Sequence, residues 1–452
     1  MSQLSSFLLF TFSFMIIPLF LLTLSFLDQY SALNPEIQKL LSKTPVFDGH
    51  NDLPYQLRLH LQNQIGKSST YDFKTDLSKS PQAWQINPLN NKTHFIATDL
   101  TRAKNGFLSA QFFSAYVSCG SQYKDAVRQT FEQIDLIKRL SEMYPEDMQF
   151  CESEKCVRDC FRNGKFASLI GLEGGHHLDS SLALIRIYHD LGVRYIAFNH
   201  FCNTPWSDYC DSNFHNGITD FGLKVVQEMN RVGMIIDLSY TSHQTMRQTI
   251  SNSKLPVMFS HSQAFGQFNT TKNIPDDVLI SLKENNGIMM VNFIGEFLCE
   301  KMNESCGIES VLDHLNYVRE LLGGSGNLGI GSAFDGISLA VKGLEDVSKF
   351  PVIFERLYED FEWSLEELEG LASDNLLRVM RDNEQGLINE DVDESWIDKT
   401  DLENSDNVEV CRTDLFLYKN EDESTTTEIN TTSGSFSIIG NVMAIYFCML
   451  NF

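Results

Sequence analysis

Basic residues are scarce in this sequence. The 452 residues include 35 Lys and Arg against 60 Asp and Glu, which gives a formal net charge of −25. So acidic a chain is repelled by nucleic acids and by bare anionic membrane surfaces, and we exclude both as partners. The charge says nothing about the fold. The length permits one large domain or two to three ordinary ones.

Several functional motifs are missing as well. The nucleophile motif Gly-x-Ser-x-Gly does not occur, and the Gly-rich stretch 171–175 lacks the Lys and the Ser or Thr of a phosphate-binding loop. We find no internal repeat. These absences argue against a serine nucleophile and against a nucleotide-phosphate site.

The amino-terminal end lacks the usual positive charge of a secretory signal. The apolar run 7–27 precedes the first basic residue, Lys39, and is longer than an ordinary signal core. We interpret residues 1–32 as a secretory signal, with an uncleaved signal anchor as the alternative. At the other end, small residues precede an apolar tail over residues 436–452, the pattern of a GPI-attachment signal. The sequence therefore predicts a protein of the secretory pathway, anchored at the extracellular face of the plasma membrane.

Cysteines and glycosylation sequons fit the same compartment. The chain has 10 cysteines, which in the secretory pathway suggest disulfides, and Cys448 would leave with the tail. Sequons occur at Asn91, Asn269, Asn303 and Asn430.

Short apolar runs alternate with segments of helical periodicity along most of the chain. The predicted strands begin with the run that opens at Pro45 and continue over 106–116, 166–173, 194–200, 234–240, 256–261, 287–293 and 327–335. The predicted helices cover 124–143, 181–191, 220–231, a segment opened by Ser242, 275–283, 311–322 and 365–380.

This alternation predicts an α/β fold, a closed (β/α)8 barrel of the TIM type, over residues 44–385. An open doubly wound sheet is the alternative. Residues between Asp52 and Thr98 are polar and irregular, and we expect a long loop there. Residues 386–435 are acidic and poor in apolar side chains, so we expect a tail or stalk.

Metal-ligating residue types end several predicted strands. In such a barrel the chemistry gathers at the carboxyl ends of the strands, and residues at i and i+2 of a strand share a face. The candidates are His50 and Asp52 on the first strand, Glu173 on the third, His200 on the fourth, His261 on the sixth and Asp335 on the eighth. Any one could be a polar strand end satisfied by a loop amide. Together they predict one or two zinc ions that activate water and polarise a carbonyl, in a metal-dependent hydrolase.

The chain closely resembles the membrane (renal) dipeptidases from about Thr44 to Val379. The segments that carry the resemblance are 48–54, 168–176, 202–208, 259–262 and 374–379. The resemblance implies a (β/α)8 barrel with a two-zinc centre that hydrolyses dipeptides, on a GPI-anchored, disulfide-linked homodimer.

The resemblance also implies roles for individual residues. His50, Asp52 and the bridging Glu173 match the ligands of the first zinc. Glu173 and His261 match two of the three protein ligands of the second zinc. His200 matches the histidine that contacts the substrate, so Glu173 and His200 are the implied catalytic residues.

Three positions depart from the family pattern. Tyr240 stands where the second zinc takes its other histidine, Lys272 where an arginine binds the substrate carboxylate, and Ala333 where the last strand has an aspartate. Tyrosine, with a pKa near 10, is a poor zinc ligand at neutral pH. Lysine loses the bidentate grip on a carboxylate, and alanine removes an acid/base group. We do not expect His243, three residues after Tyr240, to substitute.

These departures predict that the chain holds at most one zinc tightly and is a weak or inactive dipeptidase. One alternative is a catalytically inactive surface glycoprotein used for binding or structure. Another is an amidohydrolase-like enzyme of different specificity, which would bind another small molecule.

For the cysteines, the resemblance implies a disulfide between Cys119 and Cys202 and an intersubunit disulfide through Cys411. Cys299 matches half of a family bridge whose partner position here is Phe268, so we predict a local Cys299–Cys306 loop instead. The remaining cysteines suffice for two more bridges of open connectivity, with a metal knuckle as the alternative: Cys151, Cys156, Cys160 and Cys210.

Overall fold

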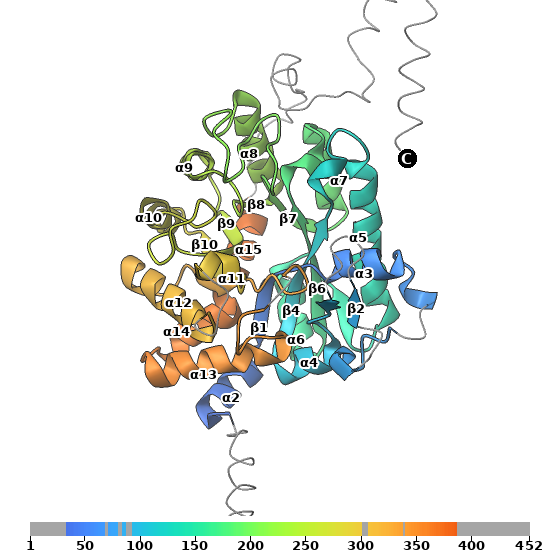
Figure 1. The fold of residues 1–452 in the computed structure, drawn as a ribbon, viewed down its shortest axis with the longest axis vertical. Coiled ribbons are helices and arrows are strands. Elements are labelled where there is room, and N and C mark those ends of the chain that lie inside the picture. The colour runs from blue at the N-terminus through green and yellow to red at the C-terminus, as the bar shows by residue number, and fades with distance from the viewer. Residues whose placement is uncertain are drawn as a thin grey trace, which may run out of the picture.

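Eight parallel strands close into a barrel in the computed structural model, which describes residues 33–67, 71–79, 84–86, 93–300, 306–337 and 340–386 (Figure 1). In order around the barrel they are β1 (Val46–Asn51), β4 (Leu108–Tyr116), β6 (Phe166–Glu173), β7 (Val193–Ala197), β8 (Ile235–Asp237), β9 (Met258–Ser262), β10 (Ile288–Val291) and β11 (Leu328–Ile330). Pairing of β4 with β6 closes the ring, and β5 (Met148–Phe150) adds to β6 from outside. The predicted (β/α)8 barrel is confirmed, and the open-sheet alternative is wrong.

Helices cover the outside of the barrel (Figure 1). Those that follow the barrel strands are α5 (Ala126–Met143), α7 (Leu182–Asp190), α8 (Asp220–Val232), α9 (His243–Asn252), α10 (Asp276–Glu284) and α12 (Ile308–Leu322). Their bounds lie within about three residues of the predicted ones, because an apolar stripe at helical spacing must face the sheet. The predicted helix 365–380 is interrupted: α14 (Leu365–Glu369) and α15 (Asn375–Gln385) flank a π-helical turn over Gly370–Asp374.

The barrel interior is a packed core. Along β6, Ala167 and Leu169 join the apolar cluster that includes Phe112 and Tyr195, whereas the alternate residue Ile170 packs into the larger outer cluster. Side chains on a strand alternate between its two faces. Glu173 therefore shares the inward face with Ala167 and Leu169, at the carboxyl end of β6.

The predicted loop between Asp52 and Thr98 is wrong. Helix α3 (Leu53–Leu61) begins directly after Asp52, and β2 (Trp84–Ile86) pairs with β3 (Thr93–Phe95) in an antiparallel hairpin. Pro54 does not prevent the helix, because proline is tolerated in the first turn, where its missing N–H has no helical partner.

Some further helices were not predicted. They are α2 (Pro35–Lys43), α4 (Leu100–Asn105), α6 (Glu154–Arg162), α11 (Gly295–Leu298) and α13 (Phe350–Asp360).

Three barrel strands end at least three residues before their predicted ends. β7 ends at Ala197, β8 at Asp237 and β11 at Ile330, so His200, Tyr240 and Asp335 lie in the loops that follow. The backbone explains two of these ends. Tyr240 has a φ of 63° and Asp335 a φ of 66°, a left-handed conformation that a strand does not contain.

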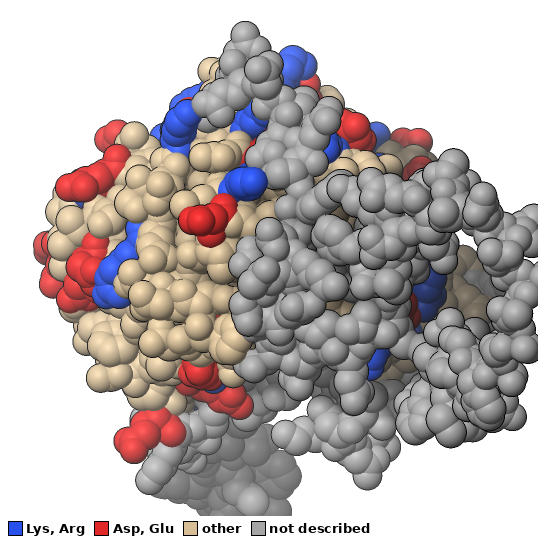
Figure 2. Space-filling view, turned by 90° about the horizontal axis from the view of Figure 1, so that it is seen from above, with Lys and Arg blue, Asp and Glu red and all other residues tan. Residues whose placement is uncertain are grey.

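The predictions for the two ends of the chain lie outside the described residues. They concern the signal or anchor over 1–32, the acidic tail with Cys411, the sequon at Asn430 and the GPI-like segment. The internal sequons at Asn91 and Asn303 also lie outside the described residues. Within the described ranges, no helix is both long and apolar enough to span a membrane. Figure 2 shows acidic and basic side chains interspersed over the described part of one face.

Candidate metal centre

One oxygen of Glu173 lies at the centre of the site. Its Oε1 faces the Nε2 atoms of His50 at 3.6 Å, His200 at 3.5 Å and His261 at 3.5 Å. Its Oε2 accepts a hydrogen bond of 3.2 Å from the Ser114 hydroxyl on β4. Glu173 is 4% exposed. Two strands and the loop after a third, all far apart in the sequence, thus bring three imidazoles to a single buried carboxylate.

His50 and Asp52 form the first half of the centre. Asp52 follows β1 directly, and its Oδ2 lies 3.3 Å from His50 Nε2. On the other side of the ring, His50 Nδ1 is 2.9 Å from the Tyr195 hydroxyl. His50 Nε2 and Asp52 Oδ1 are buried and have no hydrogen-bond partner among the described residues. A Cβ at Gly336 would lie 2.0 Å from Asp52 Oδ2, so only glycine leaves room for this carboxylate.

His261 belongs to the second half, and its hydrogen bonds fix its tautomer. The Ser260 hydroxyl donates to Asp237 Oδ2 at 2.5 Å and must therefore accept from His261 Nδ1–H at 2.8 Å. The Nε2 lone pair of His261 consequently points toward Glu173. All three residues of this Asp–Ser–His relay are buried. Such a relay orients an imidazole toward a metal and raises its basicity.

The charges around Glu173 favour a cation. Burial lowers the pKa of His50, but the carboxylates of Asp52 and Glu173 outweigh burial and raise this pKa to about 9. Burial raises the pKa of Glu173, but His50 and His200 outweigh it and lower this pKa far below its usual range. The ligand atoms of His50, Glu173 and His261 lie within 4.8 Å of one another. Nitrogen and carboxylate donors in this arrangement fit a divalent metal such as zinc.

Tyr240 fills the position opposite His261. Its ring centroid lies 5.2 Å from that of His261, 4.8 Å from that of His200 and 4.8 Å from that of Phe201. Burial, reinforced by Glu173 and Asp52, raises the pKa of Tyr240 well above its ordinary value. The phenol therefore stays protonated in the metal-free protein and offers no anionic ligand.

His243, which we did not expect to substitute for Tyr240, lies apart from the centre. It is the first residue of α9, and its Nε2 hydrogen-bonds to the Asn273 carbonyl oxygen at 2.9 Å. It takes no part in the cluster around Glu173.

Lys272 lies on the same wall as Tyr240. Its Nζ is 5.7 Å from the centroid of the Phe201 ring and 5.3 Å from that of Phe297. An ammonium group over two aromatic faces gains cation–π stabilisation. No carboxylate in the described part of the chain forms an ion pair with Lys272, so its charge is available to an anionic ligand.

The predicted aspartate on the last strand does not join the cluster. Asp335 accepts hydrogen bonds from the Ala97 N–H at 2.7 Å and from Asn51 Nδ2 at 3.2 Å, so it fixes neighbouring loops. Ala333 is buried, and its N–H donates to the His50 carbonyl oxygen at 3.1 Å.

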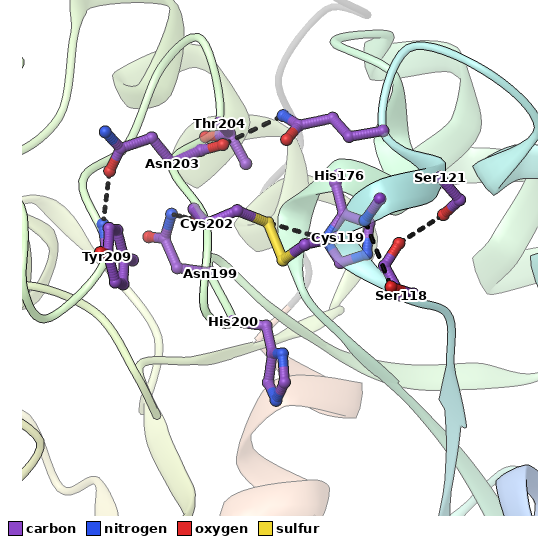
Figure 3. Close-up of a disulfide and its surroundings, with 12 residues drawn as sticks. Ser118, Cys119, Ser121, His176, Asn199, His200, Cys202, Asn203, Thr204 and Tyr209 are labelled. Carbon is purple, nitrogen blue, oxygen red and sulfur yellow. Dashed lines mark hydrogen bonds between the residues drawn. A yellow bond between two sulfur atoms is a disulfide. The ribbon is translucent and has the colours of Figure 1, made fainter. Parts of the chain in front are cut away.

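The Cys119–Cys202 disulfide ties two loops beside the site (Figure 3). Cys119 follows β4, and Cys202 comes two residues after His200. In Figure 3 the His200 ring points away from this disulfide, and His176 lies beside it. His176 Nε2–H donates to the Val117 carbonyl oxygen at 2.9 Å. The bridge therefore restrains the loop that carries His200.

The structure also contains the predicted Cys299–Cys306 disulfide. Of the cysteines whose pairing was left open, Cys151 and Cys156 form a disulfide. The four cysteines suffice for two bridges, but one forms, because Cys160 and Cys210 are free in the described structure and lie in different apolar clusters.

Sequence reasoning missed the residues that support the ligands. Two of them could have been found from their positions. Ser260 immediately precedes the candidate ligand His261, and Asp237 ends its strand, as several candidate ligands were predicted to do. Tyr195 and Ser114 lie in the middle of apolar runs, where nothing in the sequence separates them from ordinary core residues.

Comparison with known proteins agrees with this geometry. The family model described as membrane dipeptidase (peptidase family M19) matches residues 34–391. Dipeptidase 3 of Rattus norvegicus is 40% identical over 353 residues, which is 76% of this chain and 66% of that relative. The match thus spans slightly less than two thirds of the relative's length.

Two solved structures share the fold. A metallopeptidase from Rhodobacter sphaeroides, liganded with a phosphinate mimic of the dipeptide L-Ala-D-Ala, has a TM-score of 0.64 and 22% identity, covering 75% of this chain and 99% of its own. An amidohydrolase from Pseudomonas aeruginosa has a TM-score of 0.61 and 19% identity, covering 77% of this chain and 98% of its own. With a family match over most of its barrel and a 40% identical relative, this chain belongs to the membrane dipeptidase family, peptidase family M19.

Proposed function

We propose that this protein is a zinc-dependent dipeptidase with one complete metal position and a weakened second one. The observation that carries the proposal is the arrangement around Glu173, which has His50 and Asp52 on one side and His261 with Tyr240 on the other. The family is metal-dependent, and the buried, unpartnered His50 Nε2 supports a metal at the first position.

The proposed ligands divide between two positions. His50, Asp52 and Glu173 would hold the first zinc ion, and Glu173 and His261 would hold the second. When bound, zinc supplies a Lewis acid that polarises a carbonyl and lowers the pKa of water. Glu173 joins both positions, so its carboxylate fixes the spacing of the whole centre.

His200 and Lys272 would bind the substrate. Within the part of the chain that the structure describes, the buried Nδ1 of His200 has no hydrogen-bond partner, so this atom could bind a polar group of a ligand. Lys272, free of any ion pair within the described residues, would attract the carboxylate of a dipeptide. Lysine does this as a point charge, without the two parallel hydrogen bonds of arginine, so it orients the substrate less well.

The second metal position is the weak point. With Tyr240 at the place of a histidine, only Glu173 and His261 remain as protein ligands there. Loss of a ligand should cost at least the tenfold to hundredfold in affinity that supporting residues are typically worth. Ala333 removes a carboxylate that would orient water or move a proton.

The same proposal includes the setting of the enzyme. Cys411 would link two chains as a homodimer, and residues 436–452 would direct a GPI anchor that holds the protein at the extracellular face of the plasma membrane. The sequon residue Asn269 is exposed, as a glycosylated asparagine must be. Ten cysteines in the chain, six of them in disulfides, agree with an oxidising compartment.

A second candidate function, a catalytically inactive surface protein that binds a ligand, is favoured by the packing of Tyr240. Its ring contacts aromatic groups on several sides, and Phe201 beside it is 49% exposed. An aromatic wall with a lysine above it can bind an anionic ligand without performing chemistry.

Zinc analysis and a dipeptide assay on the purified full chain test these proposals. We expect about one tightly bound zinc per chain and slow hydrolysis that a chelator abolishes. Two tightly bound zinc ions with fast turnover would contradict the weakened centre. Bound zinc without any hydrolysis would favour the binding function.

A further inference from the structure

Three cysteines gather away from the metal centre. Cys151 directly follows β5, and its N–H bonds to the Ser168 carbonyl oxygen near the beginning of β6. Glu173 ends that strand, roughly 16 Å further along at the usual rise per residue. Cys156 and Cys160 lie on α6 at positions i and i+4, which share one face of a helix. The three sulfur atoms lie within 4.8 Å of one another.

In this cluster a free thiol touches a disulfide. Cys151 and Cys156 are disulfide-bonded, and Cys160 is free. The Cys160 Sγ lies 3.5 Å from the Cys151 Sγ, which is direct contact between the two atoms. Cys151 therefore has two possible partners on the same face of one helix.

The two helix cysteines differ in their surroundings. Cys160 is 0% exposed and packs in the same apolar cluster as Cys151, Val157 and Leu377. Cys156 is only half-buried, and its Sγ accepts a hydrogen bond of 3.3 Å from Gln149 Nε2. A free thiol at Cys160 is thus hidden from solvent, whereas a free thiol at Cys156 would be reachable.

We propose that Cys151, Cys156 and Cys160 form an intrachain thiol–disulfide exchange site. Cys160 gives up its proton, and its thiolate attacks the Cys151 Sγ. The Cys151–Cys156 bond breaks, its electron pair leaves with the Cys156 Sγ, and Cys156 takes up a proton. One S–S bond forms and one breaks, so the step needs no oxidant or reductant.

The exchange moves the free thiol of this cluster from a hidden to a reachable position. The product has a Cys151–Cys160 disulfide inside the apolar cluster and a thiol at Cys156. That thiol is then open to covalent modification by thiol-reactive molecules, for which accessibility is a main requirement. Cys156 is therefore the modification site that this cluster creates.

The surroundings of Cys160 also explain why the Cys151–Cys156 disulfide would exchange only slowly. Burial raises the pKa of Cys160 to about 11, with smaller opposing effects from Lys165, which lowers it, and Asp159, which raises it. Only the thiolate attacks a disulfide, so a mostly protonated Cys160 makes the exchange slow at neutral pH.

The sequence offers a direct readout. Trypsin cleaves after Arg139, Lys155, Arg158 and Arg162, so the three cysteines fall on separate peptides, 140–155, 156–158 and 159–162. The full chain would be incubated at neutral pH with N-ethylmaleimide for increasing times, denatured in acid, digested and analysed by mass spectrometry without reduction. We expect the amount of the disulfide-linked peptides 140–155 and 156–158 to decline with time. Over the same period, maleimide should accumulate on peptide 156–158. Labelling of 159–162 alone, or no labelling of any of the three, would overturn the proposal.

Two matched variants complete the test. Cys160→Ser removes the attacking thiol, so its 156–158 peptide should stay unlabelled for the same incubation. Cys156→Ser leaves Cys160 as the remaining partner of Cys151 in this cluster. A disulfide should therefore link peptide 140–155 to peptide 159–162. If Cys160→Ser is labelled on 156–158 as fast as the unmodified chain, or if folded Cys156→Ser keeps both thiols free under oxidising conditions, the exchange does not occur. Circular dichroism reports whether each variant is folded.

Discussion

The two halves of the metal centre share Glu173 but differ in where their other residues lie. His50 and His261, like Glu173, belong to barrel strands, and the proposed centre takes all three as metal ligands. Tyr240 and Ala333, two of the three positions at which the proposal expects a departure from the family pattern, lie in loops after strands and have φ angles of 63° and 59°. In the proposed centre, three ligands come from strands and Asp52 comes from the position directly after β1, whereas Tyr240 and Ala333 lie further along the loops that follow their strands.

The difference has a consequence for the metal. In the described structure the first half has two buried atoms without hydrogen-bond partners, His50 Nε2 and Asp52 Oδ1, and a cation bound there would satisfy both. The second half has an oriented His261 but a protonated phenol beside it. A single zinc ion should therefore prefer the side of His50.

Replacement of the shared carboxylate should have the largest effect. Glu173→Gln removes the charge that both halves use, so we expect zinc affinity and dipeptide hydrolysis each to fall by at least about 100-fold. Equilibrium dialysis and kcat/KM measure the two losses. Ser114→Ala removes only a hydrogen bond to Glu173 and serves as the control, with a much smaller loss. Tight zinc binding by a folded Glu173→Gln variant would show that the centre is misassigned.

Separate removal of the two histidines tests the comparison directly. His50→Ala should abolish the tightly bound zinc, because it removes a ligand of the complete half. His261→Ala should retain about one zinc per chain, although hydrolysis falls. Zinc content after gel filtration distinguishes the two variants. Equal losses in both would mean that the halves do not differ in affinity.

Restoration of the three changed positions should repair the weak half. Tyr240→His, Lys272→Arg and Ala333→Asp together should raise the zinc content toward two per chain and increase kcat/KM by about tenfold to a hundredfold. The backbone permits this, because His and Asp adopt positive φ more readily than most residues other than glycine. Lys272→Arg alone, the control, should lower KM with little change in zinc content. An unchanged zinc content in the triple variant would contradict the account of Tyr240.

Removal of the supporting hydrogen bonds should give the smallest effects. Tyr195→Phe deletes the hydroxyl that contacts His50 Nδ1 and should weaken the tight zinc by about tenfold. Ser260→Ala breaks the relay from Asp237 to His261 and should leave the tight zinc almost unchanged. Competition with a chromophoric chelator measures both. The opposite ranking would place the tight zinc on the His261 side.

Much of the centre could be predicted from the sequence, because its ligands end apolar runs. Continuous apolar runs such as 166–173 predicted strands buried on both faces, and the barrel rule then brought Glu173 to the same rim as His50 and His261. The shortened strands before His200 and Tyr240 could not be predicted, because the apolar pattern continues past the point where the backbone leaves the sheet.

Residue types and spacing along the chain predicted the barrel and the candidate ligands. The resemblance to the family, in turn, implied the departures at Tyr240, Lys272 and Ala333. Only the tertiary structure decided which nitrogen of His261 faces Glu173, which group supports His50, and that Cys160 stands beside the Cys151–Cys156 disulfide. These features depend on contacts between segments far apart in the chain, or on side-chain directions within one turn. Neither leaves a periodic signal in the sequence.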